Sequence, residues 1–155
     1  MMKSKIIKIV LAFVLIAIGV IAYLWFMPHR NVQSVDAFKT IDATELVNEF
    51  LVNKEKANTT YLDSEEGESK VLIVTGTVSK ISKDQLGQYV LLLKKDADKM
   101  GVSSTFTLES NSQVAEIKIG DTVKVKGVIR SGAEYDEDLD LIENVIIEKS
   151  ALIIN

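Results

Sequence analysis

The N-terminal part of the chain contains one long apolar run. Nineteen consecutive residues, Ile9 to Met27, carry no charge. At about 1.5 Å per residue a helix of that length covers ~28 Å, close to the hydrocarbon core of a bilayer. No helical phase of the run has a polar face, which argues against a buried helix of a soluble protein. The pattern predicts a membrane-spanning helix over residues 9–27.

Charges on either side of this run predict its orientation. Lys3, Lys5 and Lys8 lie in a basic segment of residues 1–8, whereas only Arg30 closely follows the run. The positive-inside rule therefore predicts that residues 1–8 are cytoplasmic and that the domain after the run lies on the extracytoplasmic side of the cytoplasmic membrane.

A cleaved signal peptide is the alternative interpretation of the apolar run. Such a peptide has a shorter apolar region and ends at a small-x-small cleavage site. This run ends instead in the bulky residues Tyr23, Trp25 and Phe26, which are typical of an interfacial belt. We therefore expect an uncleaved single-pass anchor.

The residues after the anchor show no clear period at first, and then a helix signal. Residues 28–41 are predicted to form a juxtamembrane linker, which includes the sole histidine, His29. Asp42 and Glu45 match an N-cap with its capping-box partner, and apolar residues recur at helical spacing as far as Tyr61. A helix is therefore expected to begin at Asp42, as the first element of a domain over residues 42–155.

Beyond an acidic loop over residues 62–70, the pattern changes to the alternation that is typical of strands. Five runs rich in Val, Ile, Thr and Leu are predicted as strands: Val71–Ile81, Gln88–Lys94, Val102–Leu108, Thr122–Arg130 and Leu139–Glu148. Gly76 and Gly127 fall inside two of them, where a small barrel bends. A short helical segment over residues 111–117 is expected to close one barrel end. These features predict a mainly β, five-stranded OB-fold barrel with one preceding α-helix.

Charge and composition narrow the function. Residues 28–155 carry a net charge of −7, and cysteine is absent. The domain is acidic and has no visible basic stripe. This argues against nucleic acid as its partner, because phosphate binding needs clustered Lys and Arg. The missing cysteines remove disulfides and thiolate chemistry.

Two short motifs resemble a known family. Val74-Thr75-Gly76-Thr77-Val78 and the segment Gly120–Gly127, together with a helix that ends at Ala57 and Tyr61, resemble the tRNA_anti-like OB-fold family over about residues 43–148. In fold that family is similar to the anticodon-binding domains of aminoacyl-tRNA synthetases, and its members are commonly small exported or membrane-anchored bacterial proteins. The acidic insertion at residues 63–68 departs from the pattern. The resemblance implies the fold and supplies no catalytic residues.

Two sets of residues are candidate sites. OB folds bind ligands on the face of their second and third strands, where Tyr89 is a candidate stacking ring and Lys94 and Lys95 are candidate cations. The alternating Asp136, Asp138 and Asp140 are candidate calcium ligands, although an EF-hand loop starting at Asp136 would also need a glycine and a glutamate that the sequence lacks. A solvated hairpin is the competing interpretation of the acidic segment.

The sequence does not assemble a catalytic constellation. It has one histidine in the linker and neither a nucleophile motif nor a phosphate-binding loop, so we expect no enzyme and no cofactor. The leading hypothesis is a non-enzymatic, membrane-anchored module that binds envelope proteins or small ligands. Single-stranded nucleic-acid binding and a calcium response are the alternatives.

Overall fold

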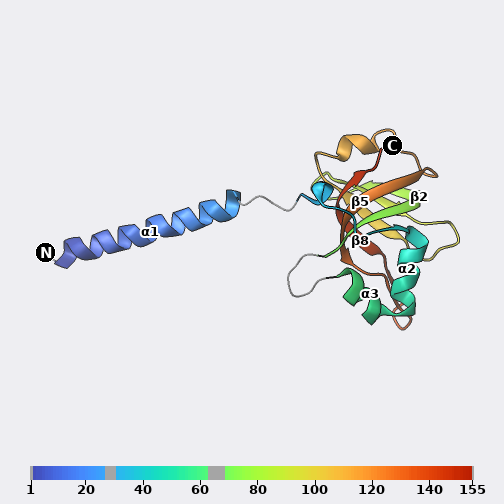
Figure 1. Ribbon diagram of the computed structural model, residues 1–155, viewed down its shortest axis with the longest axis horizontal. Coiled ribbons are helices and arrows are strands. Elements are labelled where there is room, and N and C mark those ends of the chain that lie inside the picture. Colours follow the sequence, from blue (N-terminus) through green and yellow to red (C-terminus); the bar gives the residue numbers. More distant parts are fainter. Residues whose placement is uncertain (1, 27–30, 63–68, 155) are drawn as a thin grey trace. The chain divides into compact units, whose positions relative to one another are not determined.

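The computed structural model describes residues 2–26, 31–62 and 69–154. The chain divides into two compact units, residues 1–30 and 31–155. The first unit is one helix, α1 (Met2–Phe26), coloured blue in Figure 1. Every side chain from Lys5 to Phe26 is exposed, and the mean hydropathy reaches 2.8. Among the described residues, this is the one helix that is long and apolar enough to cross a membrane.

The second unit is built on a closed barrel of five strands (Figure 1). They are β2 (Val71–Lys83), β3 (Tyr89–Leu93), β4 (Val102–Phe106), β5 (Thr122–Ser131) and β8 (Val145–Leu152). Neighbours pair in the order β2-β3-β4-β8-β5, and β5 returns to β2. The β4–β8 pair is parallel and the others are antiparallel. This connectivity is the predicted OB-fold barrel.

The last predicted strand is displaced along the sequence. Residues 139–148 were expected to be continuous, but β6 (Glu134–Asp136) and β7 (Leu141–Glu143) form a separate two-stranded hairpin. Asn144 interrupts the run, and its Oδ1 accepts a hydrogen bond from the Gly101 amide at 2.9 Å. The barrel strand β8 begins only at Val145. Leu139 and Leu141 are consequently exposed rather than part of the core.

The predicted helix begins where expected but is interrupted. Asp42 caps α2 (Ala43–Val52), because its side chain accepts a hydrogen bond from the Thr44 amide at 2.9 Å. Asn53 then leaves the helical conformation with φ −151° and ψ 86°. Its side chain accepts from the Lys56 amide and caps a second helix, α3 (Lys54–Tyr61). An asparagine favours such a cap over the interior of a continuous helix.

The expected linker contains ordered structure from Asn31 onward. The 3-10 turn η1 (Val32–Ser34) buries Val32 against Val71 and Val128 on the outer side of the barrel. The short strand β1 (Lys39–Asp42) then pairs in parallel with the first half of β2. Residues 27–30, which include His29, lie outside the described part.

The core fills the barrel and continues beneath the helices. The largest fully buried side chains include Tyr61, Phe50, Phe106, Leu46 and Leu72. The short turn η2 (Asn111–Val114) contributes Val114 to this core, which fits the predicted helical segment. Phe106 is buried as its strand parity indicates, whereas Leu108 is 64% exposed because β4 ends two residues earlier.

Two glycines permit close contacts that join the parts of this unit. A Cβ at Gly127 would lie 2.4 Å from Ile147 Cγ2, at the point where the β5–β8 register shifts. A Cβ at Gly132 would lie 2.1 Å from the Phe50 ring. Gly132 therefore provides the space in which α2 anchors its aromatic side chain to the end of β5.

We expect Gly132→Ala to destabilise the domain by about 1–3 kcal/mol, because the new methyl group overlaps the Phe50 ring. Urea unfolding of the full-length chain in detergent, followed by circular dichroism, measures the change. In a Phe50→Leu background the same substitution should cost clearly less. An equal cost in both backgrounds would contradict the ring contact as the cause.

Candidate functional site

The usual OB-fold ligand face does not carry the predicted stacking ring. Tyr89 has the same strand parity as Leu91 and Leu93, which are fully buried, and its ring packs partly buried against the core. The Lys83 ammonium lies 4.5 Å from the Tyr89 ring centroid. The outward-facing residues of β3 and β4 are instead aliphatic or hydroxylic: Val90, Leu92, Ser103 and Thr105.

The two candidate lysines lie beyond the other end of β3. Lys94 Nζ donates to the Asp98 carbonyl at 2.8 Å, and Lys95 Nζ lies 3.7 Å from Asp42 Oδ1. The structure thus does not bring Tyr89, Lys94 and Lys95 together. Strand parity turns Tyr89 inward, and local partners engage both ammonium groups.

The three candidate metal ligands serve the β6–β7 turn. Asp136 Oδ1 accepts from the amides of Asp138 and Leu139, and Asp140 Oδ1 accepts from the Tyr135 hydroxyl at 2.9 Å. Across the residues that the structure describes, no three His, Cys, Asp or Glu side chains lie close enough to hold a metal ion. The acidic segment forms the hairpin of the competing interpretation.

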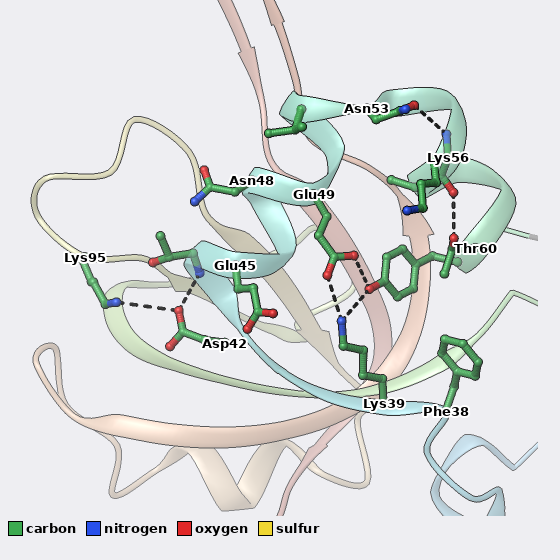
Figure 2. A pocket seen from close by; sticks show the side chains of 14 residues that line it. Phe38, Lys39, Asp42, Glu45, Asn48, Glu49, Asn53, Lys56, Thr60 and Lys95 are labelled. Carbon is green, nitrogen blue, oxygen red and sulfur yellow. Dashed lines mark hydrogen bonds and ion pairs between the residues drawn. The ribbon is translucent and has the colours of Figure 1, made fainter.

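An open groove lies between β1 and the two helices, and we call it the helix groove. Its volume is about 1020 Å³, at the upper end of the range of small-molecule sites. Figure 2 shows Asp42 and Lys95 at one end, Lys39 and Glu49 in the middle, and Lys56 and Thr60 at the other end. The lining residues are Phe38, Lys39, Asp42, Thr44, Glu45, Asn48, Glu49, Val52, Asn53, Lys56, Ala57, Thr60, Tyr61 and Lys95.

Local capping and burial hold the groove walls in place. Thr44 Oγ1 donates to Asp98 Oδ2 at 2.7 Å, which ties the start of α2 to the loop after β3. On the next helix, Ala57 and Tyr61 are buried one turn apart and fix α3 to the core. The walls are thus built from three elements with separate attachments to the barrel.

Three side chains from the three walls meet in the middle of the groove (Figure 2). Lys39 Nζ from β1 lies 2.8 Å from Glu49 Oε1 on α2, and the Tyr61 hydroxyl on α3 donates to Glu49 Oε2 at 2.5 Å. Lys39 Nζ also donates to the Tyr61 hydroxyl oxygen at 3.4 Å. The cluster therefore cross-links β1, α2 and α3.

These contacts shift the pKa values of all three groups. The hydrogen bond to Glu49 raises the pKa of Lys39 despite its partial burial. Burial raises the pKa of the Glu49 carboxyl, but the hydrogen bonds from Lys39 and Tyr61 outweigh burial and lower it. Burial, followed by the hydrogen bond to Glu49, raises the pKa of Tyr61. At neutral pH the cluster is a fixed ammonium–carboxylate pair with a neutral phenol, an arrangement suited to structure and recognition rather than proton transfer.

Exposed apolar surface flanks this polar centre. Phe38 is 53% exposed, and its ring meets the Tyr61 ring edge-on with centroids 6.2 Å apart. Val52, at the end of α2, is 86% exposed. The helix groove thus offers a ligand both apolar contact and charges of either sign.

Sequence reasoning missed this groove because one of its walls, with Phe38 and Lys39, comes from the expected linker. Phe38 and Lys39 precede the N-cap of α2 within four residues, in a stretch too short to show a strand period. The four residues Phe38-Lys39-Thr40-Ile41 do not alternate between apolar and polar, so the sequence carried no strand signal here. Ile41 is nevertheless buried in the core.

The closed barrel with the β2-β3-β4-β8-β5 order defines an OB-fold protein. A family model, tRNA_anti-like, matches residues 1–137. The chain therefore belongs to the tRNA_anti-like family. No curated protein matches the sequence at a significant level.

One solved structure is similar to the chain in fold. A lipoprotein from Klebsiella pneumoniae subsp. pneumoniae MGH 78578, named as a candidate nucleic acid-binding protein, superposes with a TM-score of 0.53 at 15% identity. The match covers 83% of this chain and 100% of the lipoprotein. The Stn1-Ten1 complex of S. pombe matches with a TM-score of 0.37 at 18% identity, over 55% of this chain and 59% of that one.

We expect Glu49→Gln to lower the stability of the domain by about 1 kcal/mol at neutral pH, because the ion pair with Lys39 becomes a neutral contact. The folded-state pKa of Glu49 is lowered, so its ionised form stabilises the fold above the unfolded-state pKa. That contribution is lost as the pH falls through the folded-state value. Thermal unfolding across a pH series should therefore show the two proteins converging only at acidic pH, below the ordinary range of a glutamate carboxyl.

Glu116→Gln is the matched control, since Glu116 is exposed, lies outside the groove and makes the same charge change. It should leave the neutral-pH melting temperature nearly unchanged. A constant difference between wild type and Glu49→Gln at every pH would contradict a role for the carboxylate charge.

Proposed function

We propose that this protein is a non-enzymatic OB-fold binding module, anchored in the cytoplasmic membrane by α1, that binds an envelope partner or small ligand in the helix groove. The observation that carries the proposal is a preformed groove of about 1020 Å³ on a barrel whose chain begins with an exposed apolar helix. The domain would lie on the extracytoplasmic side.

Length and charge support the anchor. Lys5–Phe26 is 22 residues long and, at about 1.5 Å per residue, reaches ~33 Å, enough to cross a bilayer. Three lysines lie in residues 1–8, and one arginine, Arg30, closely follows the helix. This bias favours a cytoplasmic N-terminus.

The chemistry of the groove supports a ligand of mixed polarity. Phe38 and Val52 offer apolar contact to a side chain or ring of the ligand. The exposed Glu45, Asn48 and Lys56 offer hydrogen bonds and charge at the rim. Lys39 and Glu49 already compensate one another, so a ligand need not carry a strong charge of either sign to enter the centre.

The test is made on the full-length chain in native membranes. A photo-crosslinking residue at Thr60 should capture one reproducible adduct, and the chain should resist alkaline extraction because α1 is embedded. Domain lysines should react with a membrane-impermeant amine reagent applied from the outer side. A chain that alkali releases would contradict the anchor.

A filled groove gives the decisive control. Asn48→Trp places a large ring in the groove and should abolish the Thr60 adduct. Leu86→Trp adds a ring in the exposed β2–β3 turn and should leave the adduct unchanged. If the adduct survives Asn48→Trp, the groove is not the binding site.

Single-stranded nucleic-acid binding is a second candidate, favoured by the nucleic-acid-binding role in the name of the Klebsiella lipoprotein. Two features of this chain speak against it. Residues 31–155 carry a net charge of −8, and the outward face of β3 and β4 has no aromatic ring.

We expect flat titrations of labelled oligonucleotides against the detergent-solubilised chain at low salt. True phosphate contacts would give binding at low salt that weakens steeply as salt rises. Saturable binding with that salt dependence would establish the second candidate. A single-stranded DNA-binding protein provides the positive control.

A further inference from the structure

Three lysines gather where the domain begins. The Gln33 side-chain amide of η1 donates to the Lys126 carbonyl at 3.0 Å and to the Lys149 carbonyl at 2.9 Å. Lys126 Nζ donates back to the Gln33 carbonyl at 3.0 Å. Lys124 lies two residues before Lys126, on the same outward side of β5. We call the surface formed by η1, Lys124, Lys126 and Lys149 the tether face.

The tether face differs in charge from the rest of the domain. Residues 31–155 have a net charge of −8, yet none of these three lysines takes part in the ion pairs found among the described residues. Three acids, Asp36, Asp42 and Glu148, lie in the segments that flank the face. These segments are residues 31–42, β2 and β8. Two of these are already paired, Asp42 with Lys95 and Glu148 with Arg130. The face therefore keeps a positive surplus.

The covalent chain restricts what can reach this face. Four residues, 27–30, separate the last helical residue Phe26 from Asn31, which caps η1. Five Cα–Cα steps span at most about 18 Å, even when fully extended. For a helix inserted in a bilayer, the start of the domain is thus confined near the head groups, where an anionic surface attracts lysines within about one Debye length, roughly 8 Å.

We propose that the tether face docks on anionic phospholipid head groups of the membrane that holds α1. This inference rests on the proposed anchor. Lys124, Lys126 and Lys149 supply the attraction, and the acidic remainder of the domain is repelled from the same surface. Docking fixes which side of the barrel faces the lipid.

The test uses the full-length chain in nanodiscs of two compositions, phosphatidylcholine alone or mixed with phosphatidylglycerol. Acetylation of each lysine by a water-soluble ester is followed by mass spectrometry. In the anionic discs at low salt, Lys124, Lys126 and Lys149 should be acetylated about five-fold more slowly. This factor corresponds to the attraction of one lysine to an anionic membrane surface. High salt should restore their rates. Lys80 and Lys83, exposed elsewhere, are internal controls that should not change.

A pair of matched double variants tests the cause. In Lys124→Gln/Lys149→Gln, the protection of Lys126 by anionic discs should fall. In Lys80→Gln/Lys83→Gln, which removes the same charge elsewhere, that protection should persist. Equal rates in both disc compositions, or protection that ignores salt, would overturn the docking proposal.

Two further outcomes have distinct meanings. A chain that does not stay in either kind of disc would overturn the anchor and the docking with it. A single-stranded oligonucleotide added to phosphatidylcholine discs is the remaining arm. If the oligonucleotide slows acetylation of the three lysines and phosphatidylglycerol does not, the face binds nucleic acid and the lipid assignment is wrong.

Discussion

The arrangement of the domain depends on the two edges of one long strand. β2 has 13 residues, and β5 pairs with the first half of one edge. On the other edge β3 pairs from Val78 onward, which leaves Leu72 to Thr75 for β1. Because β1 occupies this vacant half-edge, it brings Phe38 and Lys39 beneath the helices. The helix groove is thus a consequence of how the barrel shares its longest strand.

Much of the fold could be predicted from the sequence because burial alternates clearly along the strands. The five barrel strands, the cap at Asp42 and the short helical segment that supplies Val114 follow from local patterns. Prediction was wrong where polar residues interrupted an otherwise periodic run. Asn144 separates the hairpin from β8, and Asn53 separates the two helices, each through a side-chain hydrogen bond that periodicity does not encode.

The candidate site was less predictable, for a different reason. Family-level reasoning directed attention to β3, where strand parity turns the partly buried Tyr89 toward the core. The groove instead combines residues far apart in sequence, from Lys39 to Lys95, and its central cluster joins Lys39 to Glu49 and Tyr61. Such a cluster becomes visible only when β1, α2 and α3 are packed on the barrel.

The β6–β7 hairpin has a consequence for neighbouring copies of the protein. It is a sheet of only two strands, so each strand leaves one edge whose backbone groups can pair with another chain. The exposed Leu139 and Leu141 add apolar surface that would favour such pairing. Glu134 pairs with Lys54 at 2.6 Å, but the exposed carboxylates of Glu137, Asp138 and Glu143 keep the hairpin negative. Repulsion between these carboxylates would oppose edge-to-edge pairing of neighbouring molecules.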